Sequence, residues 1–549
     1  MFYYMNDLAN QKTLYDAIPP ESSGAPCSDT ASNGEGESLG SGNDSVRIKV
    51  SIDDAIDAVG LSWSPAGVHC RLFTATGLLF MVDSMELGIL AFLSRAIDQR
   101  IEEYHDNYIA WSGVGGSLVG AIVLGFLADN PRIGRRKITI CVSWLITIFG
   151  IATALLCTTK TTSDDAVVEG LLVSRFLVGF GLGGLTIPYD LLAEWLPNVQ
   201  PVSNLQNNAN SPFVSLRRGQ VLLLVYLFWS VGSLLIFGLL QTDTRLSPQQ
   251  GQFTGIELWW CTLPAVVATI LLTSTTIFES PRFLLAHGKH DEALSILKTA
   301  AIYNGKDLSL LFPPETDIRL YSSESQSQLT QSQSLPTSAS DNLFSNKWLK
   351  LASALLFTYF GQAFCYRGTA NMLVATFNED QHPQQFQSFF SAISEVVGIM
   401  LLLFTIEAYP PWGGRVLSQV ASYALAALSC LTLAAWYAVP SLKNGNVLIV
   451  MTFIARMLIF GGGVVTWVST TEVLRTEHRT TGHAIAAGVA GRLGAFVATL
   501  AFPEIDYIPS LALIVFFGGI AIALTAGDIP ETRGKDMGRS YNLLGPSER

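Results

Sequence analysis

The stretch SRFLVGFGLGG, residues 174–184, recurs in altered form as ARMLIFGGG, residues 455–463. In both stretches an arginine precedes a glycine cluster within an otherwise apolar run. Likewise ESPRF, residues 279–283, corresponds to PETRGK, residues 530–535, near the end of each half of the chain. This internal correspondence predicts two repeated halves, in which the glycines let neighbouring helices approach closely.

The chain contains twelve apolar segments, two of which include the glycine clusters. The length of each segment is close to the roughly 20 residues that a helix needs to cross a bilayer. Six contain no charged residue: 107–128, 138–159, 219–242, 258–278, 416–442 and 507–527. The other six are interrupted by ionisable residues: 70–93, 167–190, 351–377, 386–406, 446–470 and 482–503. The sequence therefore predicts an all-α membrane protein with twelve transmembrane helices in two pseudo-symmetric six-helix bundles.

The composition agrees with this fold class. Of the 549 residues, 49% are apolar and only 14% are charged, and the mean hydropathy is +0.37. A soluble multidomain chain would carry about 25% charged residues to cover its surface, so that class is excluded. The net charge of −11 arises mainly in the first 60 residues, which hold ten acids and three bases, so we expect no nucleic-acid partner.

The distribution of lysine and arginine predicts the orientation. With the N-terminus placed in the cytoplasm and the loops assigned alternately, 24 of the 33 bases lie on the cytoplasmic side, five on the opposite side and four inside helices. By the positive-inside rule, both termini are expected in the cytoplasm. The predicted parts are a largely disordered acidic tail (1–68), a bundle (69–278), a cytoplasmic loop (279–347) with a short helix at 290–301 and a Ser/Gln-rich linker at 322–342, a second bundle (348–528) and a C-terminal tail (529–549).

Charge follows a regular order along the predicted helices. Numbered from the N-terminus, helices 1, 4, 7, 8, 10 and 11 contain ionisable residues, whereas helices 3, 6, 9 and 12 contain none. A charge at the bilayer centre costs about 2.5–3.5 kcal/mol on insertion scales, so charged helices are expected to face a polar interior and the others lipid. One lipid-facing helix at every third position indicates a three-helix unit repeated four times.

Several motifs resemble those of the major facilitator superfamily, over about residues 65–540. The loop GFLADNPRIGRRK (125–137) is similar to the superfamily signature, with two extra residues between Asp129 and Gly134. FESPRFLL (278–285) and IPETRGKDM (529–537) resemble sugar-porter motifs, while GLLFMVDSMELGILAFL (77–93), LLAEWLP (191–197) and SEVVGIM (394–400) resemble synaptic-vesicle-glycoprotein-like and organic-ion transporters. The loop IEAYPPWGGR (406–415) departs from the signature, and helix 7 lacks the glutamine pair of sugar porters, so a hexose is not the expected substrate.

The first candidate site lies in helix 1. Asp83 and Glu86 are three residues apart, which places both carboxylates on one helix face. Within the membrane, two such acids are candidates for carrying a proton or binding an organic cation. The alternative is a structural ion pair with a base such as Arg175.

The other intramembrane charges suggest further roles. Arg367, with Gln362, Tyr366 and Asn371, could bind a carboxylate or phosphate, or could reach the membrane interface as a structural arginine. Glu395 is either its partner or a second proton site. For the other intramembrane charges we expect roles in inter-helix pairing or in lining a cavity: Arg175, Asp190, Arg456 and Arg492.

Charged loop residues form a third candidate group. Asp129 can accept free amides at another helix N-terminus, while Arg135 and Arg136 can pair with acids across the interface between the halves. The resemblance implies that such contacts hold the cytoplasmic side closed; the alternative is that they are solvated loop residues. The same network is expected to include Glu194, Arg217, Glu279, Arg282, Glu472, Arg479 and Glu531.

These features predict a secondary transporter that moves a small organic solute, charged or zwitterionic, by alternating access with H⁺ as the coupling ion. It is expected to act as a monomer in the plasma membrane or an internal membrane. The seven cysteines and seven histidines show no metal-site or catalytic spacing, so we expect no metal, no cofactor and no enzymatic activity. The alternatives are a sugar or polyol porter and a non-transporting receptor or vesicle component with a transporter fold.

Overall fold

The structure is a computed structural model of the full chain. It describes residues 46–65, 67–98, 107–158, 164–198, 216–246, 256–273, 277–312, 316–322, 346–379, 384–408, 413–439, 445–502, 505, 507–535 and 537. The rest of the predicted N-terminal tail, most of the Ser/Gln-rich linker and the end of the C-terminal tail lie outside these residues.

Long apolar helices account for most of the described chain. In the first half they are α3 (Val68–Asp98), α4 (Asn107–Ala128), α5 (Arg135–Thr158), α6 (Asp164–Gly183), α7 (Thr186–Trp195), α9 (Arg218–Leu246) and α10 (Ile256–Thr273). Three short helices follow, α11 (Pro281–Ala286), α12 (His290–Tyr303) and α13 (Leu308–Leu311). The second half contains α15 (Asn346–Glu379), α16 (Gln384–Thr405), α17 (Arg415–Ala438), α18 (Gly445–Val473), η3 (Thr476–His478), α19 (Arg479–His483), η4 (Ala484–Gly491), α20 (Arg492–Ala501) and α21 (Ile508–Gly527).

Nine helical spans in the described part of the chain are long and apolar enough to cross a membrane. They are Val68–Ile89, Tyr108–Ala128, Arg135–Thr158, Ala166–Trp195, Arg218–Ile236, Arg415–Ala438, Asn446–Val473, Thr476–Ala501 and Ile508–Gly527. Two shorter apolar helices, Leu258–Thr273 and Phe389–Thr405, run beside them. The chain is therefore a multi-pass α-helical membrane protein.

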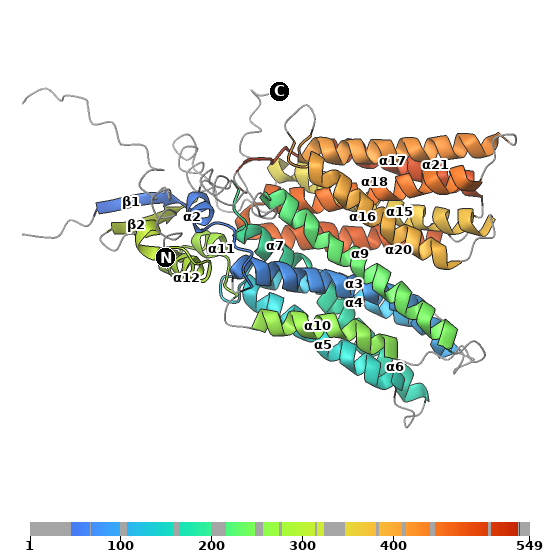
Figure 1. Ribbon diagram of the computed structural model, residues 1–549, viewed down its shortest axis with the longest axis horizontal. Helices are drawn as coiled ribbons and strands as arrows, with labels where there is room; N and C mark the ends of the chain where they lie inside the picture. Colours follow the sequence, from blue (N-terminus) through green and yellow to red (C-terminus); the bar gives the residue numbers. More distant parts are fainter. Residues whose placement is uncertain are drawn as a thin grey trace, which may run out of the picture.

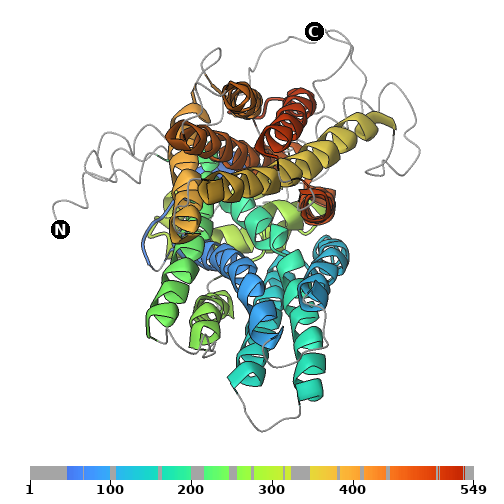
Figure 2. The same cartoon turned by 90° about the vertical axis from the view of Figure 1, so that its right-hand side faces the viewer.

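Helices pack mainly with neighbours from their own half. In the first half α4 and α5 pack on α6, and α3 packs on α9 and α10; in the second half α17 packs on α18 and α21, and α15 on α18, α20 and α21. The halves meet where α9 contacts α16 and where α4 contacts η4. Figure 1 shows the two sets of helices close together beside α7 and α11 and diverging toward the opposite end, and Figure 2 shows most of the first half below the second.

The glycine clusters of the two repeats lie where helix backbones touch. A Cβ atom placed on Gly179 of α6 would lie 2.0 Å from the carbonyl oxygen of Gly113 on α4. In the second half, a Cβ on Gly461 of α18 would lie 3.2 Å from the carbonyl oxygen of Gly398 on α16. A larger residue would push these helices apart, so these glycines set the inter-helix distance.

Two of the predicted helices are not continuous. The helix predicted over 167–190 is interrupted at Gly184 and Leu185, where α6 ends and α7 begins. The helix predicted over 482–503 contains a π-helical segment, η4, between α19 and α20. His483 directly precedes this segment and Arg492 directly follows it.

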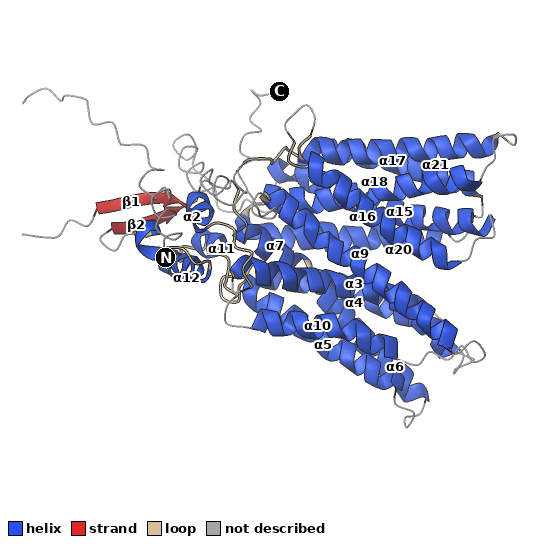
Figure 3. Cartoon of the chain, in the orientation of Figure 1, coloured by secondary structure: helices blue, strands red, loops and turns tan. Residues whose placement is uncertain are grey.

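Residues 46–59, near the end of the predicted tail, form a strand and a helix. β1 (Val46–Ser51) pairs in parallel with β2 (Thr316–Tyr321), as Figure 3 shows. α2 (Ile52–Val59) follows at once, and the Ser51 hydroxyl caps it by accepting a hydrogen bond from the Asp53 amide at 3.3 Å. The sequence did not predict these two elements, because the acidity of the whole tail concealed a short apolar strand and an amphipathic helix, whose partners lie far along the sequence.

Candidate functional site between the two halves

Asp83 on α3 and Arg492 at the start of α20 form an ion pair between the halves. The Arg492 Nη2 group donates to both carboxylate oxygens of Asp83 at 3.3 Å. The side chain of Asp83 is 7% exposed, whereas that of Arg492 is 25% exposed. Because one partner is partly exposed, this pair is easier to separate than a fully buried one.

Glu86 has a different partner within its own half. Arg175 on α6 donates to the Glu86 carboxylate, and both side chains are buried. The structural pairing considered as the alternative for helix 1 is therefore present for Glu86. Each of the two carboxylates, Asp83 and Glu86, has its own arginine, so the two acids do not form an uncompensated pair.

Glu395 on α16 is bound mainly by its own half. Arg456 donates to it at 2.8 Å, and the Tyr366 hydroxyl donates to it at 2.5 Å. The Arg456 guanidinium also lies 4.3 Å from the centre of the Tyr366 ring. Ser230 on α9 lies 3.5 Å from the second carboxylate oxygen, so Glu395 also reaches the first half. The pairing of Glu395 with Arg367 is not found, because Arg456 and Tyr366 occupy the carboxylate.

The polar residues of helix 7 do not form one group. Arg367 is exposed, and its Nε group donates to the hydroxyl of Thr499 on α20 at 3.4 Å. Gln362 instead lies beside Gly463 of α18, where an added Cβ would meet its amide nitrogen at 2.4 Å. Asn371 is partly buried one helical turn after Arg367. The predicted anion site is therefore divided between a face toward α18 and a face toward α20.

Asp129, at the end of α4, makes the amide contact that its position predicts. Its carboxylate accepts a hydrogen bond from the backbone amide of Thr481 in the first turn of α19 at 2.8 Å. It also accepts a bond from the Thr480 hydroxyl and pairs with Arg135 at 3.0 Å. An anion here stabilises the free amides of the α19 N-terminus and ties the first half to the second.

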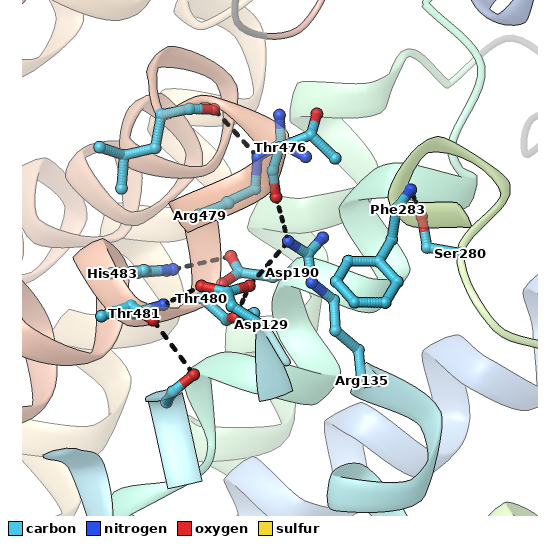
Figure 4. A network of polar contacts seen from close by, with 12 residues as sticks. Asp129, Arg135, Asp190, Ser280, Phe283, Thr476, Arg479, Thr480, Thr481 and His483 are labelled. Carbon is cyan, nitrogen blue, oxygen red and sulfur yellow. Dashed lines mark hydrogen bonds and ion pairs between the residues drawn. The ribbon is translucent and has the colours of Figure 1, made fainter. Parts of the chain in front are cut away.

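Glu194 on α7 is bound by arginines from both halves. Figure 4 shows these two arginines, Arg135 and Arg479, among the neighbouring polar residues. Arg135 of the first half and Arg479 of the second both donate to the same Glu194 oxygen, and all three side chains are fully buried. Arg135 also donates to the carbonyl oxygen of Thr476 at 2.5 Å. We call Asp129, Arg135, Glu194, Thr476 and Arg479 the charge network, and the end of the molecule that contains it the network end.

Glu472 on α18 is the centre of a second cluster at the same end. Arg415 of its own half binds both of its oxygens at 3.0 and 3.1 Å, and Arg218 of the first half binds one at 2.9 Å. Arg415 also pairs with Glu407 at 2.8 Å. The predicted Arg217 is not the residue that enters this cluster: it is 47% exposed and lies 3.8 Å from Glu407, because the helix places Arg218 on the buried face.

Glu279 and Glu531 each bind backbone amides at the start of a helix in their own half. Glu279 accepts the backbone amides of Arg135 and Arg136 at the start of α5, and Glu531 accepts those of Arg415 and Val416 at the start of α17. Arg136 thus contributes its backbone amide rather than the cross-interface ion pair that was predicted for its side chain. Burial raises the pKa of Glu279 above its ordinary value, against the opposing effect of the Ser280 and Arg136 amides.

Glycine is required beside each of these glutamates. Gly134 and Gly414 have φ values of 85° and 110°, which residues with a Cβ rarely adopt. A Cβ at Gly134 would lie 2.2 Å from a Glu279 oxygen, and one at Gly414 would lie 2.7 Å from a Glu531 oxygen. The degenerate second loop therefore keeps the same local structure as the first.

Arg282 connects the N-terminal segment to the charge network. Its guanidinium donates to the Asp53 carboxylate on α2 and to the backbone carbonyl of Glu194 at 3.1 Å. Burial opposes the charged form of Arg282, but the carboxylate of Asp53 outweighs this effect and raises the pKa. Asp57 of α2 also accepts the Asn198 amide at 2.7 Å, so α2 is fixed beside the network end.

Asp190 on α7 is joined to the second half by a histidine. His483 Nδ1 lies 2.8 Å from an Asp190 carboxylate oxygen, and His483 Nε2 lies 3.2 Å from the Tyr359 hydroxyl on α15. Both Asp190 and His483 are fully buried. The sequence predicted no role for His483, because an isolated histidine in an apolar segment has no distinctive spacing.

An aromatic cluster lies between the histidine and Asp83. Trp467 of α18 is 4.6 Å from the His483 ring and contacts Tyr189, Tyr226, Tyr359 and Phe80 at 5.5–6.1 Å between ring centres. These rings come from both halves and fill the interface beside the charge network. No spacing in the sequence indicates this cluster, because its members come from five different helices.

A comparison with protein-family models shows which family the chain belongs to. The model described as "Sugar (and other) transporter" matches residues 90–191 and 214–539, which is more than half of the chain. The chain belongs to this family.

Curated relatives and solved structures agree with this assignment to the sugar-transporter family. The Synaptic vesicle 2-related protein of Xenopus laevis is 25% identical over 89% of this chain and 82% of its own length. Organic cation/carnitine transporter 7 of Arabidopsis thaliana is 22% identical over 89% of this chain and 96% of its own length. The fold is similar to that of the proton:xylose symporter XylE, with a TM-score of 0.63 and 18% identity over 90% of this chain and 98% of XylE. The chain is therefore a member of a transporter family of the major facilitator superfamily.

Proposed function

We propose that this sugar-transporter family member is a secondary active transporter of a small charged or zwitterionic organic solute, coupled to H⁺ and working by alternating access. We further propose twelve transmembrane helices in two six-helix bundles, with both termini in the cytoplasm. The nine apolar spans together with α10, α15 and α16 supply the twelve helices. On this orientation the network end is cytoplasmic.

The Asp83–Arg492 pair carries this proposal. It joins the halves, it lies within the apolar spans, and its arginine is partly exposed. Protonation of Asp83, or a cationic group of the solute binding to it, would release Arg492 and with it one tie between the halves. A carboxylate on the solute could then bind Arg492, so a zwitterion would engage both members of the pair.

The charge network and the second cluster around Glu472 support a state closed to the cytoplasm. Glu194 and Glu472 each bind an arginine from the opposite half, and Asp129 holds the start of α19. Figure 1 shows the halves diverging away from this end, as an outward-facing transporter requires. Loss of these contacts would let the halves rock toward the inward-facing state.

Uptake into proteoliposomes tests the proposal. The purified chain is assayed with a panel of organic cations, zwitterions, organic anions and neutral sugars, with and without an inward H⁺ gradient. We expect uptake of a charged or zwitterionic solute that the gradient stimulates, and loss of this stimulation in Asp83→Asn. Uptake of neutral sugars alone would contradict the proposed solute class, and no uptake of any solute would favour the non-transporting alternative.

Glu86→Gln separates two possible proton sites. Because Glu86 is buried with Arg175, we expect this variant to lower the amount of folded protein more than it changes the pH dependence of uptake. A pH dependence lost in Glu86→Gln but kept in Asp83→Asn would move the proton site from Asp83 to Glu86. An unchanged pH dependence and affinity in both variants would exclude helix 1 as the coupling site.

A further inference from the structure

The hydrogen bonds around His483 fix the direction of each donor in turn. Thr470 donates to the carbonyl oxygen of Thr466 at 2.7 Å, and Tyr359 donates to the hydroxyl oxygen of Thr470 at 3.1 Å. The Tyr359 oxygen is then left to accept a bond from His483 Nε2 at 3.2 Å. Reversing the direction of these hydrogen bonds would require Thr470 to give up its bond to the Thr466 carbonyl.

The other ring nitrogen faces a carboxylate. His483 Nδ1 is 2.8 Å from Asp190 Oδ1, and this contact requires a proton on one of the two atoms. With Nε2 already donating to Tyr359, the pair holds one proton more than a neutral imidazole and an ionised carboxylate would hold. The contacts of His483 are thus all made when the Asp190–His483 pair has bound that proton.

The charges facing the pair favour the same state. Arg135 of α5 and Arg479 of α19 act on Asp190, and both are bound to Glu194, while Arg135 is also bound to Asp129. These two cations and the three carboxylates Asp129, Asp190 and Glu194 leave one negative charge, which a proton on the pair cancels. The Arg282–Asp53 pair beside Glu194 adds one charge of each sign. Tyr189 and Tyr359 face the pair as well and add no charge as neutral phenols. A buried cluster of zero net charge avoids the cost of an uncompensated charge.

The pair also spans the interface between the halves. Asp190 lies on α7 of the first half, while His483, Tyr359 and Thr470 lie on α19, α15 and α18 of the second. When the halves separate at the cytoplasmic end, the histidine loses the carboxylate that stabilises its proton. Binding of the proton and closure of this end must therefore favour each other.

We propose that Asp190 and His483 form a second proton-binding site, distinct from Asp83, which binds a proton from solution when the cytoplasmic end closes and releases it when that end opens. This inference rests on the alternating access proposed above. The site makes closure stronger at low pH and weaker at high pH.

Distances between the halves measure this coupling without any solute. Spin labels at Asn130 and His478, which are exposed residues of opposite halves, report opening of the cytoplasmic end in lipid nanodiscs after replacement of the native cysteines. We expect the short-distance population to grow as the pH falls from about 8.5 to 5.5, and this growth to be lost in His483→Gln and in Asp190→Asn. Tyr359→Phe should move the midpoint of the change about one pH unit lower, because it removes an acceptor for the histidine proton.

His69→Gln provides the matched control. His69 is also fully buried near this end, but its Nε2 contacts the Trp195 carbonyl at 2.9 Å within the first half, so the pH response should be unchanged. A wild-type response that persists in His483→Gln and Asp190→Asn, a response lost equally in His69→Gln, or no wild-type response would overturn the inference. If His483→Gln does not fold, Asp190→Asn and Tyr359→Phe decide the question.

The outcomes separate this inference from the proposed function. Solute uptake without a pH-dependent distance change would leave the proposed function standing and overturn the second proton site. A distance change that depends on His483, combined with no uptake of any solute, would support the second site and contradict the proposed function.

Discussion

Glu194 and Glu472 occupy equivalent positions in the two halves, and each is bound by one arginine from its own half and one from the other. Arg135 and Arg479 bind Glu194, while Arg415 and Arg218 bind Glu472. All of these side chains are buried, so removal of one arginine leaves a carboxylate without its full compensation. The network end is therefore held together by two related clusters rather than by one.

Arg479→Gln is expected to destabilise the closed state by about 3–5 kcal/mol, which is the cost of breaking a buried ion pair. Arg218→Gln should act in the same direction through Glu472. The accessibility of a cysteine introduced at the network end to a thiol reagent measures the opening. Lys350→Gln is the control, because its pair with Asp528 is exposed and contributes less than about 1 kcal/mol. Equal accessibility in all three variants would show that the two clusters do not hold this end closed.

The Glu86–Arg175 pair should show strong coupling between its members. Either Glu86→Gln or Arg175→Gln leaves one buried charge unpaired, so each single variant should lower the unfolding temperature clearly. The double variant removes both charges and should lose less stability than the sum of the single variants. Thermal unfolding of the purified proteins in detergent measures this. Additive losses would mean that the two side chains do not interact.

Gly179→Ala should destabilise the protein because its new methyl group would overlap the Gly113 backbone on α4. We expect a loss of about 1–3 kcal/mol, as for overpacking of a core. Gly115→Ala is the matched control: no atom lies within 4 Å of a Cβ at that position, so its effect should be neutral or stabilising. The unfolding temperatures of the two variants give the comparison, and a smaller loss in Gly179→Ala would contradict the close packing of α4 on α6.

Asp53→Asn should release α2 from its site beside α12. The substitution leaves the buried guanidinium of Arg282 without its carboxylate partner. We expect faster hydrogen exchange and proteolysis over residues 46–60, with little change in the transmembrane helices. Asp291→Asn on the exposed face of α12 is the control and should leave exchange over residues 46–60 as in the wild type. Unchanged exchange in Asp53→Asn would show that the ion pair does not hold α2 in place.

The membrane helices could be predicted well because their signal is local. Apolar runs of sufficient length identify them. Asp129 and Glu279 could be predicted as members of the charged loop group because each lies close to a helix end. The interruption at Gly184 and the π-helical segment η4 could not be predicted, because no local pattern distinguishes them from a regular apolar helix.

Partners across the interface were harder to predict than the charged residues themselves. Asp83, Glu86, Glu395 and Arg456 were identified as intramembrane charges, but which arginine meets which acid depends on how the helices are rotated and packed. The one-residue difference between Arg217 and Arg218 has the same origin, since helix rotation decides which side chain is buried. His483 and Trp467 were missed because an isolated histidine or tryptophan in an apolar segment has no distinctive pattern.

The parallel pairing of β1 with β2 has a consequence for biosynthesis. β1 is translated before the first membrane helix, but its partner strand, Thr316–Tyr321, is translated only after α10. A strand waiting for its neighbour presents unpaired backbone groups and is open to other partners. Completion of this small sheet can therefore occur only after the ribosome has produced the entire first half. Pairing of β1 with β2 is thus a late step in folding of the nascent chain.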